Sequence, residues 1–189
     1  MAASVLEYRT LMDLHTLPTV MVGLIEETCK LLVPVAIFVV GRYRREADGI
    51  LFGVASGLGF AAFETMGYGV TALFLSHGHI GEVEKLLFLR GVLAPAGHGA
   101  WTGCVCAMLW RARVRRTAEA KAAVLFAFIA AVTFHALWDS ATSLWLQLAI
   151  GVVSLLLLSW RIRAAGRKGS KQRRTPAPRA LINHGRVQV

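Results

Sequence analysis

Five long apolar stretches set the first limit on what this chain can fold into. A segment of about 20 apolar residues can cross the roughly 30 Å hydrocarbon core of a membrane as an α-helix, and such a helix satisfies its own backbone hydrogen bonds in lipid. The stretches cover residues 17 to 40, 49 to 75, 90 to 110, 122 to 142 and 144 to 160. We therefore expect an all-α integral membrane protein, a bundle of about five transmembrane helices.

The basic residues are unevenly distributed, and their positions predict an orientation. The net charge is +10, and Lys and Arg concentrate in residues 41 to 48, 111 to 121 and after 160. These segments lie on one side of the expected bundle, which the positive-inside rule identifies as the cytoplasm. We predict a multi-pass protein of the cell membrane with its N-terminus outside and its C-terminus cytoplasmic. Because topology accounts for the charge, we predict the lipid bilayer but no nucleic acid as a partner.

The composition changes near residue 163, which divides the chain into two parts. Residues 1–163 contain all five apolar stretches, so we expect them to form the helical bundle. Residues 164–189 combine many basic residues with Pro, Gly and Ser, a composition typical of disorder. We expect a basic, disordered cytoplasmic tail.

Three ionisable residues interrupt the first apolar stretch. The segment GLIEETCKLL contains Glu26, Glu27 and Lys30. Three charges inside a membrane cost roughly 8 to 10 kcal/mol on insertion scales, against about 4 to 8 kcal/mol returned by the apolar residues of this helix. Lys30 is one turn after both glutamates, so one carboxylate can pair with it on the same helix face. The other needs a partner from another helix, a water-filled cavity or a proton.

The next three apolar stretches each carry a polar pair with a spacing of four. The pairs are Glu64 with Tyr68, His98 with Thr102, and His135 with Asp139. Residues four apart share one helix face. At 1.5 Å per residue, Glu26, Glu64, His98 and His135 all fall at one level in the outer half of the membrane. The spacing therefore predicts a polar cluster in which four helices meet.

Glycines predict which helices approach closely. Gly53 and Gly57 in the second stretch, and Gly99 and Gly103 in the third, form GxxxG patterns, which allow helix backbones to pack tightly in lipid. We expect these two helices to be in contact.

Several other residues are not expected to carry chemistry. We interpret the three cysteines as small core residues because they fall within the spans in an odd number. Three histidines and two glutamates are interpreted as exposed loop or tail residues. The two sets are Cys29, Cys104 and Cys106, and His77, His79, Glu82, Glu84 and His184.

Imidazole and carboxylate groups at one depth point to a metal or a proton-transfer site. Neutral imidazole and carboxylate are suitable zinc ligands, with one position left open for water. The candidate ligands are Glu64, His98 and His135, while Asp139 could accept the other ring N–H of His135 and orient it. A purely structural interpretation is a buried ion pair with Lys30, but this leaves one carboxylate unexplained.

The combination of these motifs resembles the PrsW family of intramembrane proteases. The matching residues are EExxK at Glu26, Glu27 and Lys30, FExxxY at Phe63, Glu64 and Tyr68, the histidine His98, and HxxW[ND] at His135, Trp138 and Asp139. The family is distantly similar to CAAX-prenyl endopeptidases and Abi proteins. The resemblance implies peptide-bond hydrolysis in or near the membrane, with a membrane protein such as an anti-sigma factor as the substrate.

Under this interpretation, Glu26 or Glu27 activates water and the other glutamate pairs with Lys30. The site residues are then Glu26, Glu27, Lys30 and Asp139 in catalytic roles, and Glu64, His98 and His135 around a divalent metal, zinc. The same residues could instead act without metal by orienting water and stabilising the oxyanion. Two alternatives from other classes are a proton- or ion-coupled carrier and a noncatalytic membrane scaffold.

Overall fold

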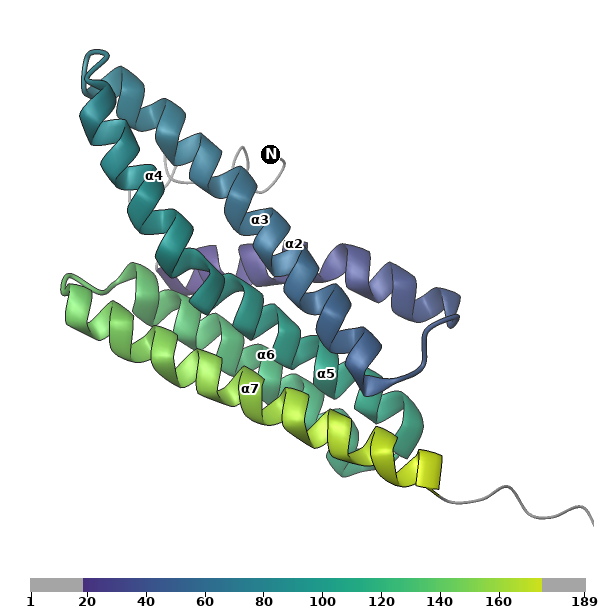
Figure 1. Ribbon diagram of the computed structural model, residues 1–189. Helices are drawn as coiled ribbons and strands as arrows, with labels where there is room; N and C mark the ends of the chain where they lie inside the picture. The colour runs from purple at the N-terminus through teal and green to yellow at the C-terminus, as the bar shows by residue number, and fades with distance from the viewer. Residues whose placement is uncertain (1–18, 175–189) are drawn as a thin grey trace, which may run out of the picture.

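The protein folds into long helices joined by short turns (Figure 1). The computed structural model describes residues 19–174, with side chains up to residue 167. The elements are α2 (Thr19–Val40), α3 (Glu46–Leu75), α4 (Ile80–Ala94), η1 (Pro95–Gly99), α5 (Ala100–Arg115), α6 (Ala118–Asp139) and α7 (Leu144–Arg174). Because α4, η1 and α5 follow one another without a break, the described residues form five continuous helical rods and no strand. The expected all-α class is confirmed.

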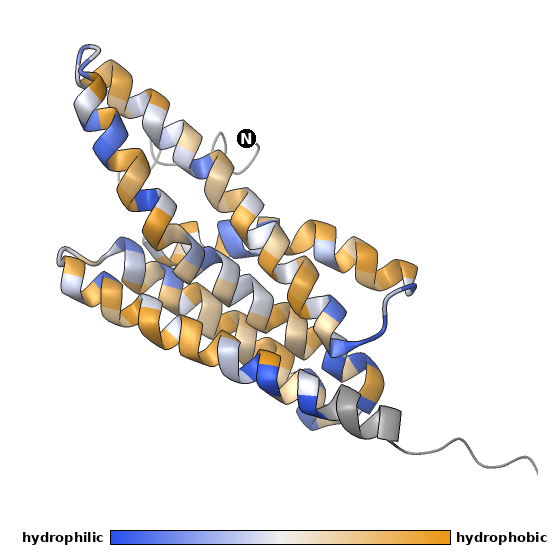
Figure 2. Cartoon of the chain, viewed as in Figure 1, coloured by the Kyte–Doolittle hydropathy of each residue, from blue (hydrophilic) through white to orange (hydrophobic). Residues whose placement is uncertain are grey.

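Four of these rods are long and apolar enough to cross a membrane. They are Glu46–Leu75, Ile80–Arg115, Ala118–Asp139 and Leu144–Arg167. Many of their large hydrophobic residues are exposed, as expected for surfaces in contact with lipid, and Figure 2 shows hydrophobic residues along most of their length. The fifth rod, α2, has 22 residues but carries Glu26, Glu27 and Lys30 in its middle. Its membrane crossing, like the orientation of the bundle, stays a prediction.

The helix boundaries differ from the expected ones at two places. Glu82 and Glu84 lie in α4 and not in a loop, because the helix begins at Ile80, soon after the left-handed residues His77 and Gly78. Packing explains this extension, since Leu87 of α4 lies against Gly69 of α3 and makes the two helices a hairpin.

The last helix also extends further than expected. α7 continues to Arg174, past the expected helix end at residue 160. The chain has no proline between Leu144 and Arg174, so no residue of this type interrupts α7. Residues 175–189, most of the basic tail with His184, lie outside the described residues.

Close packing of α3 against η1 and α5 confirms the contact predicted from the glycines. A Cβ atom at Gly53 would lie 2.6 Å from the carbonyl oxygen of Thr102, and one at Gly57 would overlap the carbonyl oxygen of His98. From the other side, a Cβ at Gly103 would lie 2.7 Å from Val54. This contact fixes the position of His98 relative to α3.

The helices enclose a core beside which the polar residues lie. The core cluster is formed by Trp101, Val105, Ala131 and Ile150 from α5, α6 and α7. Figure 1 shows α5, α6 and α7 side by side, with the α3–α4 hairpin leaning away from them at its turn.

Candidate functional site

The charged residues of α2 point into the bundle. Glu26, Glu27 and Lys30 are 2%, 1% and 1% exposed. The ammonium of Lys30 lies 2.8 Å from Oε1 of Glu27 and 3.2 Å from Oε2 of Glu26. Lys30 therefore contacts both carboxylates, where the sequence predicted a pair with only one of them. Its backbone carbonyl accepts a hydrogen bond of 2.6 Å from Ser56 of α3, which fixes α2 against that helix.

A distorted turn places the first histidine. η1 is a π-helical turn between α4 and α5 that contains His98, which is 3% exposed. Such turns are rare and occur frequently at functional sites. Here it carries His98 to within 2.7 Å of the Lys30 ammonium, measured from its Nδ1 atom.

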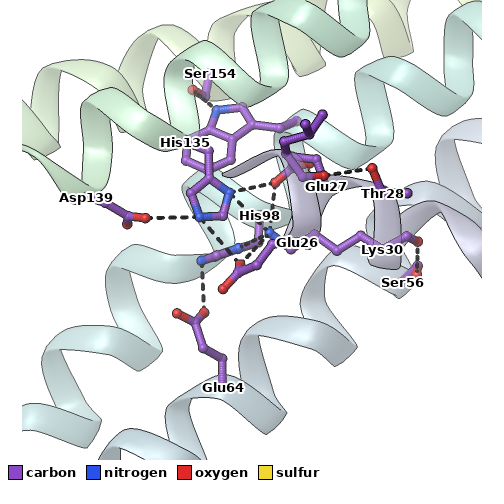
Figure 3. Close-up of polar contacts among 12 residues, drawn as sticks. Glu26, Glu27, Thr28, Lys30, Ser56, Glu64, His98, His135, Asp139 and Ser154 are labelled. Carbon is purple, nitrogen blue, oxygen red and sulfur yellow. Dashed lines mark hydrogen bonds and ion pairs between the residues drawn. The ribbon is translucent and has the colours of Figure 1, made fainter. Parts of the chain in front are cut away.

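The second histidine connects α6 to both glutamates of α2. Nδ1 of His135 lies 2.9 Å from Oε1 of Glu27, and its Nε2 lies 3.4 Å from Oε2 of Glu26. The sequence predicted that one glutamate of α2 needs a partner from another helix, and that partner is the imidazole of His135. Figure 3 shows these side chains converging from separate helices.

The two ring nitrogens of each histidine face different surroundings. Both Nδ1 atoms face Lys30, at 2.7 Å for His98 and 3.4 Å for His135. Both Nε2 atoms face carboxylates: that of His98 lies 3.3 Å from Glu64, and that of His135 lies 3.2 Å from Asp139. The Nδ1 side is therefore a supporting side that fixes ring orientation, and the Nε2 side is the one open to a ligand.

Glu26, His98 and His135 could hold a metal ion. Each offers one ligand atom, and these atoms all lie within 4.8 Å of one another in the interior of the bundle. Two imidazoles and a carboxylate form a donor set typical of catalytic zinc, which retains one open position. The residues present therefore fit a divalent metal. One condition follows from the Lys30 contact: His98 can bind metal through Nε2 only when its Nδ1 carries the proton, so Lys30 could not then donate to it.

Glu64, which the sequence placed among the ligands, has a different position. Its Oε2 lies 2.9 Å from Nη2 of Arg90, as well as 3.3 Å from Nε2 of His98. Arg90 also donates from Nε to Thr65 at 3.3 Å and stacks over the Tyr68 ring at 4.0 Å. Arg90 thus connects α4 to the FExxxY segment of α3.

Sequence reasoning missed Arg90 and Trp101. Arg90 begins the third apolar stretch and precedes His98 by about two helical turns on the same face, but no role was predicted for it. The Trp101 ring lies 5.7 Å from His98 and 5.4 Å from His135, and its indole N–H donates to Ser154 of α7 at 2.8 Å. Trp101 belongs to the apolar core, which therefore packs directly against both histidines.

Exposure shows from which side the cluster can be reached. The side chains of Glu26, Glu27, Lys30, His98 and His135 are at most 4% exposed. In contrast, Glu64 is 14% and Asp139 is 34% exposed. The Glu64 and Asp139 carboxylates, toward which the Nε2 atoms of both histidines point, therefore lie on the less buried side of the cluster.

A family described as "PrsW family intramembrane metalloprotease" has a sequence model that matches residues 2–162. The matched range includes every residue of the cluster, from Glu26 to Asp139. No curated protein and no solved structure matches the chain.

Proposed function

Because the chain belongs to the PrsW family of intramembrane metalloproteases, a family of multi-pass membrane peptidases, we propose that it hydrolyses peptide bonds of membrane-associated proteins near the outer half of the bilayer. The observation that supports this proposal is the buried group of Glu26, His98 and His135, whose ligand atoms lie within 4.8 Å of one another. The outer-half position follows from the predicted orientation.

In the proposed mechanism, Glu26, His98 and His135 would hold a divalent metal, zinc. When bound, the metal supplies a Lewis acid that polarises the peptide carbonyl and favours deprotonation of water. Glu27 accepts the Nδ1–H of His135 across 2.9 Å, which fixes that ring with Nε2 toward the reaction side. Lys30 offsets part of the negative charge of the two glutamates. Glu27 and Lys30 are therefore positioning residues.

Two carboxylates remain beside the proposed metal position. Glu64 is next to Nε2 of His98 and Asp139 is next to Nε2 of His135, and both are on the less buried side. With Glu26 engaged as a ligand, Glu64 is placed to accept the proton of the attacking water. This exchanges the roles that the sequence suggested for Glu26 and Glu64.

The substrate peptide must unwind to reach this site, because a helix hides its carbonyl groups in its own hydrogen bonds. The exposure of Asp139 supports entry past the C-terminal end of α6. Substrates are membrane proteins or peptides, and an anti-sigma factor is the example suggested by the resemblance.

The test separates metal binding from cleavage with two matched isosteric variants. Wild type, Glu26→Gln and Glu64→Gln are purified at full length, and zinc per chain is measured beside cleavage of single-span membrane peptides. We expect zinc in wild type and Glu64→Gln, little in Glu26→Gln, and cleavage by wild type alone. His79→Ala, which removes an exposed histidine of the α3–α4 turn, should keep both properties.

Other outcomes would change the proposal in defined ways. Zinc lost from Glu64→Gln but kept in Glu26→Gln would restore the ligand set expected from sequence. An active wild type without metal would require the glutamate-only mechanism. A folded wild type that cleaves none of the peptides, with or without added zinc, would count against the peptidase proposal.

A further inference from the structure

A basic pocket lies at the end of the bundle where α2 and α5 end and α6 begins. Its volume is about 550 Å³, and its lining includes Arg113, Arg116 and Lys121 beside the apolar residues Phe38, Leu109 and Val124. The residues of the candidate functional site do not line it: Glu26, Glu27, Lys30, Glu64, His98, His135 and Asp139. Figure 2 shows hydrophilic residues gathered at this end, next to the linker between α2 and α3.

The three cations of this pocket are not neutralised within it. No Asp or Glu is among the lining residues, and the nearest acid along the chain, Glu119, is fully exposed and directed to Thr117. Three positive charges around one cavity repel one another. An anionic group in the cavity would relieve this repulsion.

The pocket wall is fixed by specific contacts. The Arg113 guanidinium lies 3.7 Å from the centre of the Phe38 ring, and its Nη2 donates to the Phe38 carbonyl oxygen. Its Nη1 is buried and has no hydrogen-bond partner in the described part of the chain. These contacts hold the Arg113 guanidinium, and with it one positive charge, beside the cavity.

The backbone of Arg116 is fixed by its position at the C-terminal end of α5. Its backbone is left-handed, with φ of 54°, and its N–H donates to the carbonyl oxygen of Ala112 at 2.9 Å. This conformation is uncommon for a residue other than glycine. The turn between α5 and α6 therefore places Arg116 and Lys121 at one cavity.

Exposed apolar residues lie close in sequence to the lining residues Phe38, Arg113 and Val124, and they indicate which anion the pocket fits. Val39 and Val40 of α2 are 73% and 78% exposed, Val114 of α5 is 69% exposed, and Leu125 of α6 is 61% exposed. In a membrane protein such residues face acyl chains. A small soluble anion would gain nothing from them, whereas a phospholipid would place its phosphate in the pocket and its chains along these residues.

We propose that this pocket binds the phosphate group of an anionic phospholipid. The bound lipid connects the end of α2 to the α5–α6 turn. It thereby stabilises the packing of the helix that carries Glu26 and Glu27. This proposal is independent of the peptidase mechanism.

The test measures lipid binding by native mass spectrometry of the full-length protein in detergent, with phosphatidylglycerol as the probe. The pocket variant is Arg116→Asn/Lys121→Gln, because asparagine tolerates the left-handed conformation and Lys121 is exposed. The matched control, Arg42→Gln/Arg163→Gln, removes two exposed arginines that do not line the pocket. We expect about 30-fold weaker binding in the pocket variant and unchanged binding in the control.

Two further probes distinguish the sources of the phosphate. Phosphatidylcholine, which has the same phosphate without net charge, should bind more weakly than phosphatidylglycerol, and inorganic phosphate should not displace the bound lipid. Equal losses in the two variants would overturn the proposal, as would equal affinity for both lipids. Displacement by inorganic phosphate would replace it with a soluble-anion site. Equal thermal unfolding temperatures of the two lipid-free variants would exclude misfolding as the cause.

Discussion

Replacing Lys30 by methionine should destabilise the protein far more than the loss of an exposed lysine. Lys30 is 1% exposed, and its ammonium is the cation beside two carboxylates that are themselves only 1% and 2% exposed. Methionine has a similar length but no charge, so Glu26 and Glu27 would remain buried without their cation. Removing one partner of a buried ion pair costs about 3 to 5 kcal/mol. For a chain of this size, that corresponds to a decrease of roughly 6 to 20 °C in the unfolding temperature.

The assay is thermal unfolding of the purified protein in detergent, with metal chelated in all samples. Lys85→Met, on the exposed surface of α4, is the matched control and should shift the unfolding temperature little. The double variant Lys30→Met/Glu27→Gln should recover part of the loss, because it removes one of the two stranded charges. If Lys30→Met unfolds at the same temperature as Lys85→Met, the ion pairs do not stabilise the fold and this reasoning fails.

Two other substitutions test how the site is positioned. Arg90→Gln removes the 2.9 Å ion pair with Glu64. It should lower the cleavage rate but cost only about 1 kcal/mol of stability, because the pair is partly exposed. Measuring the cleavage rate and the unfolding temperature in parallel separates the two effects. Gly57→Ala would place a methyl group against the carbonyl oxygen of His98, so we expect a loss of about 1 to 3 kcal/mol of stability and a lower zinc content. Gly67 has open space around it, so Gly67→Ala should keep both the stability and the zinc content of the wild type.

The sequence was sufficient to predict the helices and the contact between their polar faces, because insertion into a membrane requires sequence patterns that can be recognised. Apolar length determines where a helix can run, and an ionisable residue within it must face the bundle interior. The i, i+4 spacing and the estimated depth predicted that Glu26, His98 and His135 lie at one level of the membrane. In the structure their ligand atoms lie within 4.8 Å of one another. The glycine pattern likewise identified the contact between α3 and α5.

What the sequence did not predict depends on side-chain direction and on local helix geometry. Spacing could not distinguish Glu26 from Glu64 as the third member of the histidine group, because both have the same estimated depth. The difference comes from Arg90, which holds the Glu64 carboxylate at 2.9 Å. The π-helical turn η1 was also not predicted, although it determines the direction of His98.

The same contacts that assemble the site also offset the cost of burying the charges of α2. Alone, this helix loses roughly 8 to 10 kcal/mol by burying three charges, and its own pairs with Lys30 offset only part of that cost. His135 of α6 provides further contacts to Glu26 and Glu27, and His98 of η1 provides one to Lys30. Folding of α2 into the bundle is therefore coupled to formation of the site. A histidine-to-alanine variant would lose activity through either cause, so a loss of cleavage can be assigned to chemistry only when a size-matched variant such as His135→Asn or His98→Gln retains the wild-type unfolding temperature.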